Sequence, residues 1–309
     1  HRRQRAAQRR RQDAMTSRSW PCPLPPVDHL QAGASPAPDF SRSLAASTPS
    51  RQAAWPGGSW DGATVTGDKP FPATACRVGL DLGCKRAGGF DVAGACSGFV
   101  FASQLAAGMV QSGQAKNILV VGAEILSRIL DYTDRNTCVL FGDGAGAAIY
   151  TSLSRAGRGE FLGGSIGMEG GAENVLAQPG GGSRHPASAD SVAQGLHFMK
   201  MGGTKVFRFA VRVFADLVRG VVEKYGRDQI GVIVPHQVNQ RIIEAAMEQL
   251  GMPMDLVFSN IDRYGNTSAA SVPIALREAY DAGRLQSGKL VVMPAFGAGM
   301  AWGHLLLRW

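Results

Sequence analysis

The chain has 309 residues, of which 45% are hydrophobic, and a formal net charge of +8 at pH 7. This size and composition predict a soluble globular protein with a substantial core in one or two domains. No apolar run is long enough to span a membrane and the basic start lacks the apolar region of a signal peptide, so we expect a cytoplasmic protein. The five cysteines, an odd number without a C-x-x-C pair, argue against a disulfide framework or a zinc site.

Most of the charge lies in residues 1–62, which hold nine arginines and four aspartates. This segment is rich in Arg, Ala, Pro, Ser and Gln and has no convincing apolar face, so we expect it to be disordered. An arginine run at residues 9–11 resembles a nucleic-acid arm, but no aromatic platform or binding motif accompanies it, and no nucleic-acid partner is expected. A solvated tail or an out-of-frame translation of a GC-rich gene is the favoured explanation.

Ordered structure is predicted to begin near Ala63, and the first reactive position is Cys96. Phe90 and Val92 are typical of the end of a buried strand, small residues at 93–95 indicate a tight turn, and apolar residues then recur at helical spacing. Cys96 is therefore predicted to lie at a helix N-terminus, where unpaired N–H groups and the helix dipole favour a thiolate. An inert buried cysteine is the alternative that this stretch leaves open.

Apolar runs and helical periodicity predict the later elements in alternation. The expected strands cover 117–122, a segment ending near Tyr150, 230–234, 290–293 and a segment through Leu307; the expected helices cover 201–225, the residues after His236, and the residues from a Ser268 N-cap through Ala282. This alternation predicts an α/β protein with mostly parallel sheets and an internal duplication.

Two glycine-rich stretches interrupt this pattern. Residues 154–190 are predicted to be irregular, and we place a boundary between two halves of the protein there. Residues 142–147 match neither the phosphate-loop motif nor the dinucleotide-binding motif, so tight backbone packing is the preferred explanation.

Three residues at predicted strand or loop ends form a chemically coherent set: Cys96, His236 and Asn266. Taken singly, His236 is typical of a structural residue and Asn266 of a turn residue. A cysteine is a nucleophile, however, and neutral His and Asn side chains donate hydrogen bonds to an oxygen that acquires negative charge. Together the three residues predict a catalytic site.

Six motifs occur in order along the chain: FDVAGACSGFVFA, LSRILDYTDRNTCVLFGDGAGAAI, KMGGTKVFRFAV, VPHQVNQRI, RYGNTSAAS and AFGAGMAWG. They look strongly like β-ketoacyl-acyl-carrier-protein synthase III (KAS III), a family of thiolase-fold condensing enzymes, from about Ala63 to Trp309. The resemblance implies a homodimer with a duplicated, five-layered α/β/α/β/α fold. Residues 63–158 would be the remainder of the first half and residues 159–309 the second half.

The resemblance also implies an acyltransferase of fatty-acid biosynthesis. Such an enzyme condenses an acyl-CoA, usually acetyl-CoA, with malonyl-acyl-carrier protein and releases CoA and carbon dioxide, without a metal or redox cofactor. Carried over to this sequence, Cys96 would accept the acyl group, and His236 and Asn266 would promote malonyl decarboxylation. Backbone N–H groups of Cys96 and of the turn at 296–299 would form the oxyanion hole.

Six further positions match binding residues of the family. The resemblance implies that Phe71 closes the partner subunit's acyl pocket, that Thr204, Phe207 and Asn239 line the pantetheine channel, that Ala298 lies in the oxyanion turn, and that Arg241 docks the carrier protein.

Residues 1–62 match nothing in the family, whose members begin with strands and helices that complete the first half and clamp the adenine of CoA. We therefore expect an incomplete first half in which apolar runs such as 118–121 are incompletely covered. A catalytically impaired KAS III remnant is one alternative function. A papain-like cysteine protease also uses Cys, His and Asn in this order, and His236 follows Cys96 by 140 residues, but the C-G-[SA]-C-[WY] motif is absent. A thiolase or a KAS I/II-type synthase would have a second histidine or cysteine in place of Asn266.

Overall fold

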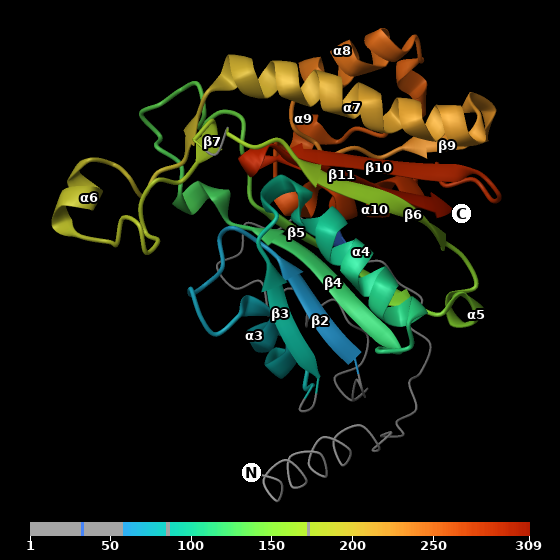
Figure 1. Ribbon diagram of the computed structural model, residues 1–309, viewed down its shortest axis with the longest axis horizontal. Coiled ribbons are helices and arrows are strands. Elements are labelled where there is room, and N and C mark those ends of the chain that lie inside the picture. Colours follow the sequence, from blue (N-terminus) through green and yellow to red (C-terminus); the bar gives the residue numbers. More distant parts are fainter. Residues whose placement is uncertain (1–31, 34–57, 85–86, 172–173) are drawn as a thin grey trace, which may run out of the picture.

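The computed structural model describes residues 32–33, 58–84, 87–171 and 174–309. The expectation of disorder at residues 1–31 and 34–57 therefore lies outside the described residues. The described chain forms two large mixed β-sheets, with helices between them and on both outer faces, and one small two-stranded sheet (Figure 1). Within the described ranges, no helix is both long and apolar enough to cross a membrane.

The first sheet has the strand order β1-β5-β4-β2-β3. Its strands are β1 (Ala32–Gly33), β2 (Gly58–Ala63), β3 (Gly88–Val92), β4 (Asn117–Glu124) and β5 (Gly144–Thr151). Strand β2 pairs in parallel with both β3 and β4, and β4 pairs antiparallel with β5. Because β2 begins at Gly58, the prediction that ordered structure begins near Ala63 is wrong. The reason is that β2 is completed by backbone pairing to two neighbours, which its glycine-rich sequence does not reveal.

The second sheet has the order β6-β11-β10-β9. Its strands are β6 (Glu160–Met168), β9 (Ile230–Ile233), β10 (Leu290–Gly297) and β11 (Ala301–Arg308). The prediction that residues 154–190 are irregular is wrong for β6, which pairs antiparallel with β11 along its length. Glycine is rare in strands, so the three glycines of β6 hide it from sequence reasoning, and the ladder with β11 supplies its stability.

The two sheets repeat one topology, which confirms the predicted duplication. In each sheet, one strand (β4 or β10) is antiparallel to the next strand in the chain and parallel to an earlier strand. Helix α4 (Gly98–Gln111) precedes β4, helix α10 (Ser271–Asp281) precedes β10, and both helices lie between the two sheets (Figure 1).

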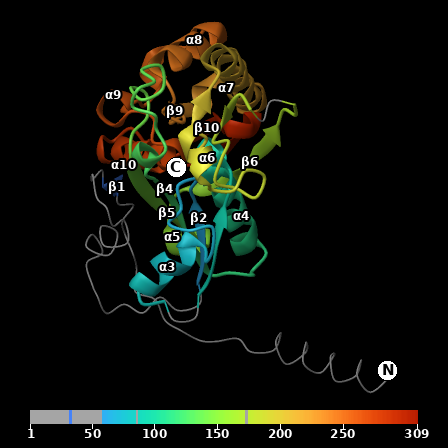
Figure 2. The same ribbon diagram turned by 90° about the vertical axis from the view of Figure 1, so that its left-hand side faces the viewer.

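Helices also cover the outer faces of the sheets. Helices α7 (Gly203–Tyr225) and α8 (Gln240–Leu250) lie on the second sheet, and α3 (Thr74–Asp81) lies on the first. Figure 2 shows α8 and α3 at opposite ends of this stack. The predicted five-layered α/β/α/β/α fold is therefore confirmed. The remaining short elements are α5 (Leu153–Ala156), α6 (Ala189–Ala193), α9 (Ile261–Tyr264), β7 (Leu176–Ala177) and β8 (Lys200–Met201).

The apolar run at the centre of β4 is buried on both faces of the first sheet. Ile118 and Val120 pack into the core between the two sheets, while Leu119 and Val121 pack against Ala75 of α3. All four side chains are buried, so the expectation that this run is incompletely covered is wrong. Helix α3 supplies the cover on the outer face.

Phe214 lies in the layer between α7 and the second sheet, and its substitution tests how much this packing contributes to stability. It is 0% exposed and lies in the core cluster that joins α7 and α8 to β9 and β10. Phe214→Ala should lower the free energy of unfolding by about 3–5 kcal/mol, because a large cavity forms in a close-packed core. Phe207→Ala on the same helix, where the ring is 37% exposed, should cost clearly less. Urea denaturation measures both values, and equal losses would contradict this account of the layer.

Candidate active site

Cys96 lies in a single 3-10 turn, Ala95–Ser97, between β3 and α4. Ala95 has φ +46°, a left-handed conformation that is uncommon for a residue with a Cβ atom. The end of β10 passes very close to this turn, because a Cβ atom added to Gly297 would lie 2.7 Å from the Cβ of Cys96. Glycine at position 297 therefore allows the two halves of the protein to meet at the cysteine.

Burial controls the ionisation of Cys96. Removal from solvent raises the pKa of the thiol to about 11, and the negative charge of Glu124 acts in the same direction. Hydrogen bonds from the Ser268 side chain and from the backbone N–H groups of Cys96 and Ala298 oppose this rise without cancelling it. The prediction that the helix start favours a thiolate is therefore wrong for the free site, because desolvation outweighs the donors. The two backbone groups that converge on the sulfur are those predicted to form the oxyanion hole.

His236 follows β9 and is 0% exposed. Its Nδ1 atom lies 2.7 Å from the hydroxyl oxygen of Ser271, and its ring packs edge-on against Phe296. Burial lowers the pKa of His236 to about 3, so the imidazole is neutral at physiological pH. Its Nε2 atom has no hydrogen-bond partner among the described residues. A buried nitrogen without a partner in a pocket wall is typical of a group that forms its hydrogen bond to a bound ligand.

Asn266 is held by backbone and side-chain hydrogen bonds. Its N–H donates to the carbonyl of Leu140 (2.9 Å), and its carbonyl accepts from the N–H of Gly142 (3.0 Å). Its side-chain Oδ1 accepts from the N–H of Ser268 at 2.9 Å. Because Oδ1 is occupied, the Nδ2 group is the end of the amide that can donate to a ligand.

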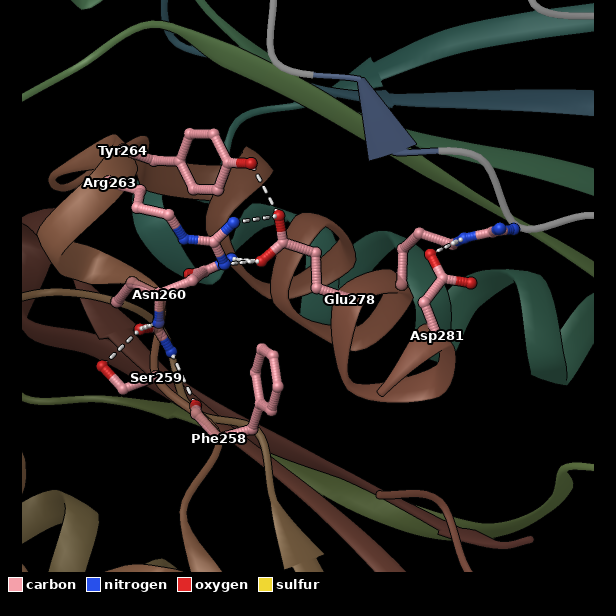
Figure 3. Close-up of polar contacts among 9 residues, drawn as sticks. Phe258, Ser259, Asn260, Arg263, Tyr264, Glu278 and Asp281 are labelled. Carbon is pink, nitrogen blue, oxygen red and sulfur yellow. Dashed lines mark hydrogen bonds and ion pairs between the residues drawn. The ribbon is translucent and has the colours of Figure 1, made fainter. Parts of the chain in front are cut away.

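The loop before Asn266 is anchored by Glu278 of α10 (Figure 3). The carboxylate of Glu278 accepts hydrogen bonds from Asn260 Nδ2 (2.8 Å) and from the Tyr264 hydroxyl (2.6 Å), and it forms an ion pair with Arg263. These three donors lie at the start of α9 and within it, so Glu278 fixes the short helix that leads into Asn266.

The glycine-rich stretch 142–147 packs tightly against this loop. A Cβ atom on Gly142 would lie 2.3 Å from the carbonyl oxygen of Tyr264. The prediction of close backbone packing is confirmed.

One pocket brings the three predicted residues together. Cys96, His236 and Asn266 all line it, and the space between its walls is about 430 Å³ including open solvent. The other walls are mainly apolar and include side chains from several elements: Phe141, Leu176, Met201, Val206, Phe209, Val238, Phe296 and Met300. A nucleophile and two neutral donors in an apolar pocket suit a reaction that develops negative charge on oxygen.

None of the six family-derived binding positions is among the residues that line this pocket. Ala298 follows the lining residue Gly297, and its N–H lowers the pKa of Cys96. Asn239 caps α8 by accepting from the N–H of Arg241 (2.9 Å). Phe207 does not line the pocket, although Val206 and Phe209 of the same helix do.

The remaining family-derived positions are on the surface. Thr204 and the side chain of Arg241 are exposed, and Phe71 is 82% exposed. The functions of these positions stay predictions.

Sequence reasoning missed a polar cluster behind Cys96. Ser268 is not the predicted helix N-cap, because α10 begins at Ser271 and Ser268 lies in a 3-10 turn with φ +50°. Its hydroxyl instead donates to Glu124 at 3.0 Å. The one sequence signal was the carboxylate of Glu124 at the end of the apolar run in β4, since buried charges are rare without a specific reason. No cluster of three or more His, Cys, Asp or Glu side chains suited to a metal occurs in the described part of the chain.

The depressed pKa of His236 predicts that the folded protein becomes less stable at acid pH. Below about pH 6.5 the unfolded chain protonates this histidine, whereas the folded chain keeps it neutral down to about pH 3. Stability from this residue is therefore lost as pH falls from 6.5 towards 3, by about 2 kcal/mol at pH 5. His236→Gln should reduce the difference between urea unfolding free energies at pH 7 and pH 5 by that amount. Parallel pH curves for the two proteins would contradict the burial argument.

Known proteins are similar to this chain in sequence and in fold. The family model described as "3-Oxoacyl-[acyl-carrier-protein (ACP)] synthase III" matches residues 90–170, and the model of its C-terminal part matches residues 223–309. β-Ketoacyl-[acyl-carrier-protein] synthase III of Desulfitobacterium hafniense is 47% identical over 249 residues, which is 80% of this chain and 75% of the relative. The enzyme of that name from Symbiobacterium thermophilum is 49% identical over 249 residues, which again is 80% of this chain and 75% of the relative.

A solved structure agrees with these relatives. The crystal structure of 3-oxoacyl-[acyl-carrier-protein] synthase III from Aquifex aeolicus superposes with a TM-score of 0.72 at 42% identity, and the match covers 81% of this chain and 77% of that one. Identity at this level over most of both chains, together with the pocket geometry, shows that the chain belongs to the 3-oxoacyl-[acyl-carrier-protein] synthase III family.

Proposed function

We propose that this chain is an acyltransferase that condenses an acyl-CoA, in the first instance acetyl-CoA, with malonyl-acyl-carrier protein. The products are 3-oxoacyl-acyl-carrier protein, CoA and carbon dioxide, as the first condensation of fatty-acid synthesis. The observation that carries this proposal is the convergence of Cys96, a neutral His236 and Asn266 in one pocket.

Acyl transfer is the first half-reaction. The sulfur of Cys96 attacks the thioester carbonyl, and the carbonyl oxygen becomes negative in the tetrahedral intermediate. The N–H groups of Cys96 and Ala298 both lower the pKa of the thiol, so they lie close enough to donate to this oxygen. Collapse of the intermediate expels CoA and leaves an acyl thioester on Cys96.

Decarboxylation of the malonyl group is the second half-reaction. Loss of carbon dioxide leaves an enolate, and its oxygen is stabilised by Nε2 of His236 and Nδ2 of Asn266. The Ser271 hydroxyl lies within hydrogen-bond distance of both Nδ1 of His236 (2.7 Å) and the carbonyl of Ser268 (2.8 Å), and it has one proton to donate. When it donates that proton to Nδ1, Nε2 carries the ring proton and is the donor to the enolate oxygen, and the Ser268 carbonyl keeps the hydrogen bond from the N–H of Ser271. The enolate carbon attacks the acyl group on Cys96, and the new carbon–carbon bond forms. This chemistry uses no metal or redox cofactor.

The positions around the pocket supply a proposed binding path. Phe207, Thr204 and Asn239 would guide the pantetheine arm towards Ala298 and Cys96, and the exposed Arg241 would contact the carrier protein.

We also infer that the enzyme works as a cytoplasmic homodimer. Phe71 supports this proposal, because an 82% exposed ring is available to enter the acyl pocket of a partner subunit.

The geometry does not favour a cysteine protease. A protease of that kind needs a histidine that takes a proton from the cysteine, but a histidine with a pKa near 3 is a weak base. In such a protease the asparagine orients the histidine. Here Asn266 Oδ1 accepts from the N–H of Ser268 instead, and the hydroxyl of Ser271 orients His236.

Acylation of Cys96 is the direct test. Incubation with acetyl-CoA should raise the intact mass by one acetyl group, and Cys96→Ser should abolish the gain. Peptide mapping locates the label. An acetyl group on Cys76, Cys84 or Cys138, with Cys96 unmodified, would refute the assignment of the nucleophile.

Separate assays of the two half-reactions test His236 and Asn266. His236→Ala and Asn266→Ala should retain Cys96 acetylation but slow malonyl-carrier decarboxylation by about 10²–10³-fold, the usual cost of losing one preorganised donor. Carbon dioxide release and intact mass report the two steps. Equal loss of both steps would instead indicate that the histidine is a general base for Cys96.

A further inference from the structure

Glu124 is a buried carboxyl group that neither half-reaction above uses. It ends β4, is 2% exposed, and accepts hydrogen bonds from the Thr66 hydroxyl (2.6 Å) and the N–H of Val65 (3.2 Å). The hydroxyl of Ser268 donates to its other oxygen at 3.0 Å. Buried carboxylates are normally paired with a cation, yet no Lys, Arg or His in the described ranges forms an ion pair with Glu124.

The neighbours of the Glu124 carboxylate donate hydrogen bonds to it. The Thr66 hydroxyl, for example, accepts from the N–H of Ile125 (2.8 Å) and donates to the carboxylate (2.6 Å). These neighbours all donate hydrogen bonds to Glu124, and such an arrangement stabilises the ionised carboxylate. Burial works against that form and raises the pKa of Glu124 to about 7, although the Thr66, Val65 and Ser268 donors restrain the rise. This carboxyl group consequently exchanges a proton near neutral pH.

Ser268 connects Glu124 to the nucleophile. Its side chain is 2% exposed, its hydroxyl donates to Glu124 at 3.0 Å, and the same side chain lowers the pKa of the neighbouring Cys96 thiol. A serine hydroxyl has one proton to donate and two lone pairs to accept with. While that proton points to Glu124, the oxygen can accept the thiol proton of Cys96. Once the proton has moved, the same hydroxyl can donate to the thiolate.

We propose that Glu124 accepts the proton of Cys96 through the Ser268 hydroxyl while the sulfur attacks the acyl thioester. As the S–H bond of Cys96 breaks, Ser268 takes that proton and passes its own to Glu124, and the sulfur forms the new bond to the acyl carbon. CoA leaves with the electron pair of the broken C–S bond. Glu124 then returns the proton through Ser268 to the departing CoA sulfur, which restores the carboxylate. This inference rests on the acyl-transfer step proposed above.

The surroundings of Glu124 make it the titrating group of this relay. The side chains that face it are the hydroxyls of Thr64, Thr66 and Ser268 and the thiol of Cys96. Of these, Cys96 alone titrates, and its pKa of about 11 is far above neutral pH. The relay therefore predicts an acylation rate that rises as Glu124 loses its proton, with a midpoint near pH 7.

Single-turnover acetylation of the full chain by acetyl-CoA, followed by intact mass from pH 5.5 to 9, tests the relay. Glu124→Gln should slow acetylation by about 100-fold or more and abolish the rise around pH 7, as expected for loss of a proton acceptor. Ser268→Ala should slow it similarly, and the double variant should be no slower than either single variant. Decarboxylation of malonyl-carrier protein by Glu124→Gln should persist.

A second readout separates proton transfer from simple electrostatics. The charge of Glu124 raises the pKa of Cys96, so removing it should let iodoacetamide alkylate Cys96 at lower pH. A purely electrostatic role therefore predicts that Glu124→Gln acetylates faster, whereas the relay predicts faster alkylation but slower acetylation. Acetylation of Glu124→Gln at or above the wild-type rate would overturn the relay alone. Absence of acetylation in the wild-type chain would overturn both the relay and the proposed function.

Thr66→Val keeps the relay intact and provides a matched variant. It removes one donor that stabilises the Glu124 carboxylate, so the pKa of Glu124 should rise. The midpoint of the acetylation profile should move to higher pH by a measurable fraction of a unit or more. An unshifted midpoint would contradict the assignment of this titration to Glu124.

Discussion

The exclusion of water from the contact between the two halves determines the chemistry of this protein. Cys96, His236 and Glu124 are all buried there, and burial drives each of them towards its neutral form. In the proposed mechanism, burial keeps His236 an uncharged donor throughout turnover. In the same mechanism, burial keeps Cys96 a thiol until a substrate carbonyl and a proton acceptor are both present. The same dry surroundings strengthen every hydrogen bond to the developing oxyanion.

The duplicated fold brings these groups together. Each half contributes a strand end followed by a tight turn, and Gly297 lets the turns come into contact at Cys96. Among the described residues, the non-glycine residues with positive φ are Ala95, Ser268 and Met300, and each lies next to or within the pocket. Such strained conformations persist where the surrounding structure over-determines them, and here the two cores on either side provide that support.

Sequence reasoning identified the elements whose signal is local. The apolar runs at β4, β9 and β10 and the amphipathic α7 follow directly from residue periodicity, and Cys96 and His236 stand at the ends of such elements. Strand β6 was missed because its glycines weaken the local signal, while its stability comes from pairing with β11. The ionisation of Cys96 was also predicted wrongly. Its helix-start position is visible in sequence, but the burial that outweighs it is a property of the assembled fold.

The polar cluster behind Cys96 was beyond sequence reasoning for the same reason. Glu124 and Ser268 are 144 residues apart, and no spacing rule connects the end of one strand to a turn in the other half. The anchor at Glu278 is similar, since it joins α10 to donors in the separate short helix α9 and at its N-cap. Partners of this kind are set by tertiary structure.

Ser268 forms hydrogen bonds to two neighbours, one through its backbone and one through its side chain. Its backbone N–H holds the amide of Asn266, while its hydroxyl contacts Glu124. A side-chain substitution at this position removes the hydroxyl but keeps the N–H, so it alters the contact with Glu124 and leaves the hydrogen bond to Asn266 in place. Evolution or protein engineering can therefore change the polar cluster behind Cys96 through Ser268 without releasing Asn266.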